Sequence, residues 1–185
     1  MGERISTTVE DGALRAKRVS SMTKAAYHLA QFNIARTRYP LDDPRMAEFV
    51  ENVERVNGLA EKIEGFVWRL QDESGHAMNM TVYDDPRILP NLAVWKNVEA
   101  LERFVWQTLH RRFFGRRLEW FEPIETPLVL WWVSVGHRPD LTEAVARLDH
   151  LRAHGPGEHA FGWESIPGAQ LWKAARSERA NEHVA

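Results

Sequence analysis

Residues 91–122 constrain the fold more than any other stretch of the chain, and they read NLAVWKNVEALERFVWQTLHRRFFGRRLEWFE. The first five are apolar enough for a short strand, and the rest predict one long helix, capped by Asn97 and bent near Gly115. One face of this helix carries residues at the spacing of a core-facing stripe: Val98, Leu101, Val105, Leu109 and Arg112. The opposite face carries a stripe of aromatic and cationic residues: Arg103, Trp106, His110, Phe114, Arg117 and Phe121. A helix with two such stripes has to be covered twice, so we expect a partner chain, a ligand or both against the second stripe.

The other regular elements are marked by alternation and by capping signals. Strands are predicted where residues alternate between two faces or are apolar throughout: residues 27–36, 66–71 and 128–135. Helices are predicted after an Asp-Pro pair and after a capping box: residues 43–62 and 140–154. Residues 72–90 are expected to form a long loop and residues 161–166 a short edge strand. We expect flexible tails at residues 1–24 and 168–185, which leaves one domain at residues 25–167.

This order of elements is βαββαβ followed by a helix and an edge strand. It predicts an α+β protein with a ferredoxin-like, antiparallel sheet and both long helices on one face. The other face then lies open although it carries apolar residues: Leu29, Val67, Ala93, Leu130 and Trp132. Because an apolar sheet face must be covered, and the same face of a second copy would cover it, we expect a homodimer.

The composition excludes several classes of function. The chain has 185 residues, no cysteine and a formal net charge of -2, so disulfides, thiolate catalysis and general nucleic-acid binding are not expected. No apolar run approaches the roughly 20 residues of a membrane span, and the first 24 residues lack the apolar core of a signal peptide. We expect a cytoplasmic protein without membrane or nucleic-acid partners. The eight Trp and eight Phe indicate either an aromatic core or a cavity for an apolar or aromatic small molecule.

Four stretches carry a family resemblance: AQFNIAR, GFVWRLQDE, LAVWKNVEALERFVWQTLHRRFFGRRLEWFE and LVLWWVSVGHRPDLTEAVARLDHLRAHGP. Over residues 27–161 the chain resembles a bacterial family known as domain of unknown function 3291. That family is similar to the dimeric α/β-barrel superfamily of the antibiotic-biosynthesis monooxygenase type, whose members bind small molecules between sheet and helix. The superfamily includes cofactor-free oxygenases, haem-degrading enzymes, haem peroxidases and isomerases, so the resemblance implies no single reaction. The cofactor it implies is haem, or none.

The haem-degrading members use an Asn on the first strand, and a Trp and a His on the helix after the third strand. By this resemblance, the Asn corresponds to Asn33 and the His to His110. The Trp does not carry over, because Phe104 stands at the nearest position and the segment before His110 is about one turn shorter. Trp106, four residues before His110, is the nearest substitute.

Three residues are our candidates for catalysis, each with a structural alternative. His110 could be a haem ligand, a general base or a hydrogen-bond donor, or it could pack under the last strand or at a dimer contact. Asn33, with Gln31 beside it, could orient a carbonyl, dioxygen or a phenol, or could satisfy the backbone of a neighbouring strand. Arg69 could bind a substrate anion, or could pair with Asp72, Glu73 or an acid of a partner chain.

Other candidates are weaker. The expected substrate-binding residues are aromatic: Trp106, Phe114, Trp132 and Trp95. The arginines at 111, 112, 116 and 117 could attract an anion or form solvated ion pairs, and His137 could be functional or could cap a helix. His150 and His154 have the spacing of two metal ligands, but no third ligand is in view, so we expect no metal site.

Three hypotheses follow. The first is an enzyme, monooxygenase-like or isomerase-like, acting on an apolar or aromatic substrate in a pocket polarised by Asn33, Arg69 and His110. The second is a non-catalytic binder of haem or of a hydrophobic metabolite. The third is a structural dimer without a pocket. A cavity that reaches His110 favours the first two, and a solidly filled sheet face favours the third.

Overall fold

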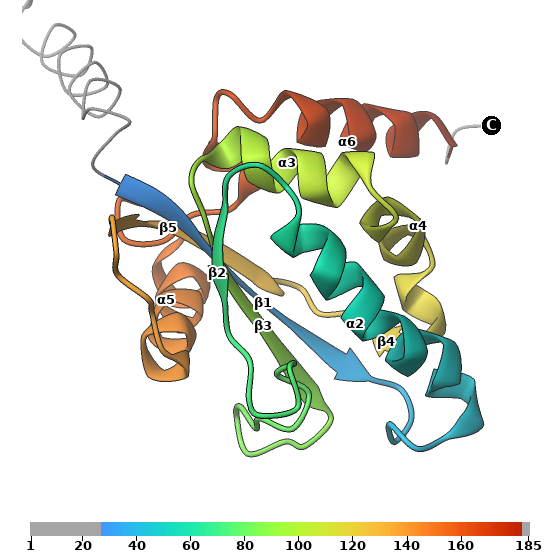
Figure 1. The fold of residues 1–185 in the computed structure, drawn as a ribbon. Coiled ribbons are helices and arrows are strands. Elements are labelled where there is room, and N and C mark those ends of the chain that lie inside the picture. Colours follow the sequence, from blue (N-terminus) through green and yellow to red (C-terminus); the bar gives the residue numbers. More distant parts are fainter. Residues whose placement is uncertain (1–26, 183–185) are drawn as a thin grey trace, which may run out of the picture.

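The computed structural model describes residues 27–182, with side chains described for residues 27–177. The expected N-terminal tail, residues 1–24, lies outside this range. The described chain forms an α+β fold around one antiparallel sheet, with strands β1 Tyr27–Thr37, β2 Phe66–Arg69, β3 Ile88–Trp95, β4 Phe121–Glu122 and β5 Leu128–Ser134 (Figure 1).

The long strand β1 is the centre of the sheet. Its partner on one side is β3, which in turn pairs with β2. On its other side β1 pairs with β5 along its first half and with β4 at its end, and every one of these pairs is antiparallel. Strand β1 therefore has both of its edges occupied, and the two faces of the sheet are left to be covered by helices.

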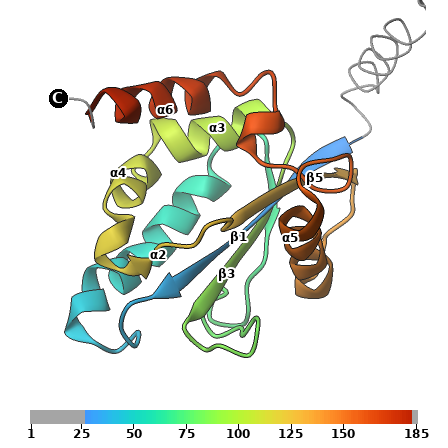
Figure 2. The ribbon, with the colours of Figure 1, turned by 180° about the vertical axis from the view of Figure 1, so that it is seen from behind.

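The helices lie on both faces of the sheet. The described helices, leaving aside 3-10 turns, are α2 Ala47–Glu61, α3 Val98–Gln107, α4 His110–Gly115, α5 Leu141–His154 and α6 Gln170–Glu182. The two views show α2, α3 and α4 on one face, α6 running along α3, and α5 on the other face (Figures 1 and 2). The predicted caps are confirmed where side chains accept the first free backbone N–H groups: Asp43 from Arg45, Asn97 from Ala100 and Asp140 from Glu143.

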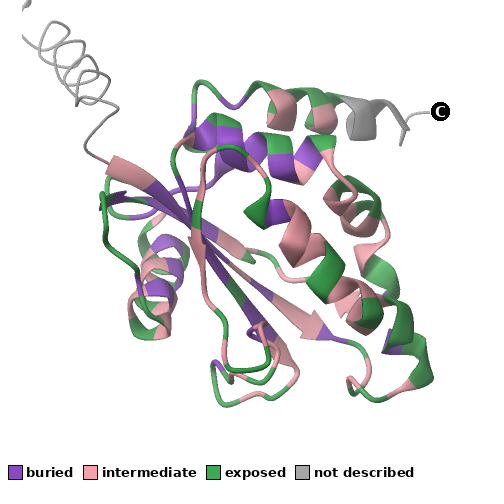
Figure 3. Ribbon diagram, in the orientation of Figure 1, coloured by how far each residue is buried: buried purple, intermediate pink, exposed green. Residues whose placement is uncertain are grey.

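The alternation of β1 assigns its residues to two faces as the sequence predicted, but each face carries its own core layer. Ala30, Phe32 and Ile34 lie in a layer closed by α5, which contributes Leu148 and Leu151. On the opposite face, Leu29 lies in a second layer with the strand residues Ala93, Trp95 and Leu130. Helix α3 closes this layer with Leu101 and Phe104. The buried residues of both layers follow the strands in Figure 3.

The predicted open sheet face is wrong. Leu29, Ala93 and Leu130, which we expected on that face, are at most 5% exposed beneath α3. The opposite face is covered by α5, so both faces are closed within one chain. Val67 and Trp132 do remain exposed, at 38% and 45%. The homodimer stays a prediction. The sequence argument for it no longer applies, because that argument required an uncovered sheet face.

The predicted long helix is broken, not continuous. Thr108 leaves the helical conformation (φ −119°, ψ −177°), which ends α3 and starts α4 two residues later. Its hydroxyl donates to the carbonyl of Phe104 at 2.7 Å and accepts from the backbone N–H of His110 at 3.1 Å. Thr108 therefore closes one helix and caps the next, and the break falls seven residues before the expected bend at Gly115.

The C-terminal part also differs from expectation. Residues 161–166 form no edge strand: Phe161 makes a single bridge to Leu130, and a 3-10 turn, Trp163–Ser165, follows. Helix α6 occupies most of the segment expected to be a flexible tail. The backbone N–H of Trp172 donates to the buried carboxylate of Glu102 at 2.9 Å, which fixes the start of α6 against α3. A contact between residues distant in sequence, Glu102 and Trp172, thus holds this segment in place.

Candidate functional site

Two cavities lie between the sheet and the helices α2, α3 and α4. The first, of about 220 Å³, is bordered by α2, β2, β3 and the loop after β2. The second, of about 480 Å³, is bordered by α3, by the approach to β5 and by residues 162–164. Six residues line both cavities: Gln31, Asn33, Asn91, Phe104, His110 and Phe114. The shared residues come from two opposed surfaces, three amides from the sheet and three rings from the helices.

The sheet side of this junction is a cluster of amides. Asn33 on β1 stands directly opposite Asn91 on β3. The oxygen Oδ1 of Asn33 accepts hydrogen bonds from Nδ2 of Asn91, at 3.0 Å, and from Nε2 of Gln31. Because two donors fix the oxygen, the NH2 group of Asn33 is held as a donor, and it makes no hydrogen bond within the described residues. The alternative role for Asn33, satisfying a neighbouring strand's backbone, is not what the structure shows.

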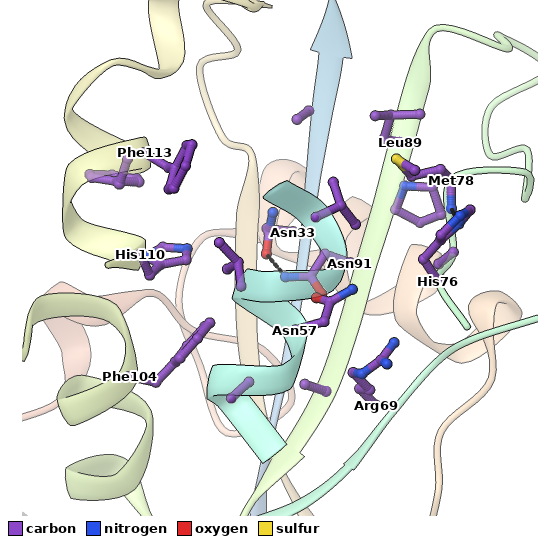
Figure 4. Close-up of a pocket in the computed structure, with 18 of the residues that line it drawn as sticks. Asn33, Asn57, Arg69, His76, Met78, Leu89, Asn91, Phe104, His110 and Phe113 are labelled. Carbon is purple, nitrogen blue, oxygen red and sulfur yellow. Dashed lines mark hydrogen bonds between the residues drawn. The ribbon is translucent and has the colours of Figure 1, made fainter. Parts of the chain in front are cut away.

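His110 stands on the helix side of the junction, at the start of α4. Figure 4 shows its ring directed toward Asn33 and Asn91. The ring packs between Phe104 and Phe114, with centroid distances of 4.8 and 6.1 Å. Its Nδ1 lies 3.4 Å from the carbonyl oxygen of Val105, which can only accept a hydrogen bond, so Nδ1 carries the hydrogen and Nε2 keeps its lone pair.

The surroundings keep His110 uncharged. Burial lowers the pKa of His110 from 6.5 to about 4, and the hydrogen bond to Val105 opposes this only in part. Neutral imidazole is the form that accepts a proton or binds a metal ion. The side chain therefore presents an unprotonated nitrogen to the cavities at neutral pH.

Arg69 lines the first cavity but pairs with an acid that we did not predict. Its side chain is only 13% exposed, and its Nε donates to Glu61 at 2.9 Å. A terminal nitrogen donates to the carbonyl of Gly75 at 2.7 Å. Asp72, one of the two acids expected to pair with it, instead accepts from Ser74 and Asn79. Arg69 thus joins α2 to the loop after β2 while bordering the cavity.

Three of the four predicted aromatic residues line a cavity. Trp95 borders the first, Trp106 the second, and Phe114 both. The indole N–H of Trp95 is buried and has no hydrogen-bond partner within residues 27–177. Trp132 borders neither cavity; it is 45% exposed and contacts Phe161, so its expected role in substrate binding is not supported. Trp132 lies near the last residue of β5. Alternation along the strand predicts the face of the sheet on which the side chain lies, but not whether another element covers it there.

The sequence reasoning missed several lining residues. Asn91, Asn57 and His76 border the first cavity, and Trp163 and Trp172 the second. The available signal for Asn91 was that it is the one polar residue of the strand predicted at residues 91–95. The two tryptophans could not have been found, because they belong to segments that were expected to form an edge strand and a tail.

Of the remaining candidates, Arg117 lines the first cavity, and the others lie outside both cavities. His137 bonds to Glu143 at 2.7 Å near the start of α5, and Arg116 pairs with Glu48 and Glu119. The rings of His150 and His154 lie 4.6 Å apart. Within the described residues, no group of three or more His, Asp or Glu could hold a metal ion. No helix in residues 27–182 is both long enough and apolar enough to cross a membrane.

Comparison with known proteins adds a family but no activity. A search among curated proteins found no match. A family model described as Domain of unknown function (DUF3291) matches residues 28–177, most of the chain and every element from β1 into α6. The protein therefore belongs to the DUF3291 family, whose function is unknown.

Proposed function

We propose that this protein binds an apolar or aromatic small molecule between the sheet and α4, and that His110 acts on it as a general base. The observation that supports this most directly is a neutral imidazole opposite the amide cluster, at the junction of two cavities. A base in such a place can remove a proton from a substrate carbon or hydroxyl without a bound cofactor. Exclusion of water would strengthen the effect of the few polar groups present.

The chemistry assigns complementary roles to the two sides of the junction. The NH2 group of Asn33 is held as a donor and suits a carbonyl or enolate oxygen. The Nε2 atom of His110 suits the proton next to that carbonyl. Return of the proton at another position would complete an isomerisation, whereas reaction of the deprotonated substrate with dioxygen would give a monooxygenase-like reaction. Arg69 would act at a distance, through its positive charge at the edge of the first cavity.

The fold supports this assignment. The strand order β2-β3-β1-β5, with α2 and α3 in the two crossovers, is consistent with a ferredoxin-like protomer of the monooxygenase-like superfamily. A homodimer remains our expectation from the resemblance alone, since α3 covers the residues against which we expected a second copy, and α5 covers the opposite face. Sedimentation of a stable monomer at micromolar concentration would contradict it.

Proton abstraction can be tested without knowing the natural substrate. Phenylacetone carries acidic protons beside a carbonyl, and their replacement by deuterium in D2O is measured by proton NMR. We expect the protein to accelerate this exchange, and His110→Phe to slow it by about 100-fold, the lower end of the effect of a positioned base. His154→Phe, on the exposed side of α5, is the matched control and should leave the rate unchanged.

The outcome separates an enzyme from a binder. Phenylacetone that binds without exchanging would exclude the role of His110 as a base and leave binding alone. Equal exchange rates in His110→Phe and the parent protein would have the same consequence. Mass spectrometry of whatever copurifies with the protein would then identify the ligand.

A non-catalytic haem binder is the second candidate. The donor set fits haem in one respect, since the neutral imidazole of His110 borders both cavities and its Nε2 has no hydrogen-bond partner within residues 27–177. Asn33 and Trp106, the residues suggested by the haem-degrading relatives, also line the second cavity. Bound haem would supply redox chemistry, and His110 would hold it through Nε2. Incubation with hemin should then give a Soret band that His110→Ala removes; an identical band in the variant would exclude this role.

A further inference from the structure

We propose that the two cavities form one elongated site, which takes a single molecule with two apolar or aromatic arms flanking a central uncharged carbonyl or hydroxyl group. This inference rests on the proposed binding function and specifies the class of ligand. The central group would lie between His110 and Asn33, one arm would enter the first cavity, and the other arm would enter the second.

The shared residues support a passage between the cavities. Of the residues that line both, Gln31, Asn33 and Asn91 belong to the sheet, whereas Phe104, His110 and Phe114 belong to α3 and α4. No hydrogen bond joins the two groups within the described residues, and Figure 4 shows the ring of His110 standing apart from Asn33. The two surfaces therefore face one another across the point where the cavities meet.

The volumes favour one ligand over two. Small-molecule sites usually measure about 300–1,000 Å³. The first cavity, at about 220 Å³, is smaller than that range, while the second, at about 480 Å³, lies inside it. A single molecule could use the first cavity only as an extension of the second, which gives the ligand one shorter and one longer arm.

The polar groups that line both cavities meet at the middle of the site. There the NH2 group of Asn33 is a donor and Nε2 of His110 is an acceptor, so a carbonyl can accept from Asn33, and a hydroxyl can also donate to His110. Aromatic residues stand on either side: Phe49, Phe66, Trp95 and Trp120 in the first cavity, and Trp106, Trp163 and Trp172 in the second. They share the walls with further polar side chains, Asn52, Asn57 and His76 in the first cavity and Thr126 in the second.

The two ends differ in charge. Among the residues that the structure describes, the charged ones that line the first cavity are Arg69 and Arg117, with no acid. Those described residues that line the second cavity include Glu125 and Glu164, but no Lys or Arg. If one arm of the ligand ends in a carboxylate, that arm should lie in the first cavity, because the acids of the second would repel it.

The test uses three probes and fluorine NMR. The probes are 1,3-diphenylacetone, which has two aromatic arms and a central carbonyl, 1,3-diphenylpropane, which lacks the carbonyl, and phenylacetone, which lacks one arm. Protein labelled with 5-fluorotryptophan reports on each cavity separately, since Trp95 and Trp120 line the first, and Trp106 and Trp163 the second. Resonances are assigned by single Trp→Phe substitutions.

We expect one molecule of 1,3-diphenylacetone per chain to shift the reporters of both cavities. Its affinity should exceed that of each other probe by about tenfold, the effect of one buried hydrogen bond or one buried ring. Two bound molecules per chain, shifts confined to one cavity, or equal affinity for 1,3-diphenylpropane would each overturn the elongated site.

Two narrowing variants give the control. Ala35→Phe fills only the first cavity and Thr126→Phe only the second; Val53→Phe on α2 replaces Ala35→Phe if that variant does not fold. Each variant should lower the affinity for 1,3-diphenylacetone at least tenfold, while phenylacetone still binds in the cavity that is left unfilled. A variant that leaves the affinity for 1,3-diphenylacetone unchanged would show that this cavity takes no part.

The proposed function and this inference fail in different ways. If none of the three probes binds and none undergoes exchange, the small-molecule function itself is wrong. If phenylacetone exchanges in a manner that depends on His110, but 1,3-diphenylacetone reaches one cavity only, the function stands and the elongated site is wrong.

Discussion

The two faces of the same sheet are packed in opposite ways. On the α5 face, Ala30, Phe32 and Trp131 are completely buried and the layer is closed by α5. On the other face, the strand residues Gln31 and Asn33 are polar, and two cavities separate much of the sheet from α2 and α4. One strand, β1, supplies both surfaces.

The difference follows from what each face has to cover it. A single regular helix, α5, lies over side chains that are almost all apolar, so dense packing is reached. On the other face the covering helix is interrupted at Thr108, and the amides prefer one another to an apolar neighbour. Where the covering helix is interrupted and the sheet residues are partly polar, packing is less dense, and the space that remains forms the two cavities. This contrast can be tested by substitutions on each face.

The largest effect should come from the filled face. Leu148→Ala on α5 removes a fully buried side chain and should lower the free energy of unfolding by about 2–5 kcal/mol. Leu128→Ala is the matched change on the other face, where the side chain borders the second cavity, and should cost about 1 kcal/mol because fewer contacts are lost. Urea unfolding measures both, and equal costs would remove the distinction between the faces.

A second test concerns the polar anchor of the filled face. The indole N–H of the fully buried Trp131 donates to the carboxylate of Glu143 at 3.0 Å. Glu143→Leu should destabilise the protein by about 1–3 kcal/mol, because the buried donor loses its acceptor. Glu143→Gln keeps an acceptor oxygen and should retain most of the stability. Similar losses in both variants, again by urea unfolding, would mean that the hydrogen bond to Trp131 is not the cause.

The break between α3 and α4 should have a smaller effect on stability and a clear effect on the site. Thr108→Ala removes the cap of α4 and should cost about 1 kcal/mol. It should also slow the deuterium exchange of phenylacetone, because His110 loses its orientation. Thr108→Ser keeps the hydroxyl and serves as the control. A normal exchange rate in Thr108→Ala would show that the break does not position His110.

The smallest change at neutral pH is expected for His110→Phe, whose effect depends on pH. Burial lowers the pKa of His110 to about 4, whereas the unfolded chain has the ordinary value of 6.5. The unfolded state therefore binds the proton first, and the contribution of neutral His110 to stability is lost as the pH falls from 6.5 to 4. His110→Phe should flatten this part of the stability curve. Titration of the His110 ring by NMR with a midpoint near 6.5 would contradict the basis of the prediction.

Much of the fold could be predicted from local signals. The capping residues Asp43, Asn97 and Asp140 act as predicted, because a cap is made by neighbours within three residues. The break at Thr108 was missed, since the apolar spacing continues through it and Thr also occurs inside helices. The ordering of α6 was missed because it depends on Glu102, 70 residues away from Trp172.

The candidate site was predicted in part. His110, Asn33 and Arg69 all border the same cavity, as the enzyme hypothesis required. The reason given for His110 was wrong, however, because it does not lie on the second stripe of one continuous helix but at the start of a new one. The acid that pairs with Arg69 also differs from the expectation.

By itself, the sequence determined which side chains β1, β3 and β5 present to each face, because alternation follows from the geometry of an extended backbone. In β2 the register shifts between Phe66 and Trp68, and these two side chains pack in different layers. It also determined where several helices begin, through short-range hydrogen bonds. Only the tertiary structure decided which face α5 covers, where the cavities remain and which residues meet across them. These depend on contacts between segments far apart in the chain, such as Asn33 with Asn91, and on the space that is left when rigid elements pack imperfectly.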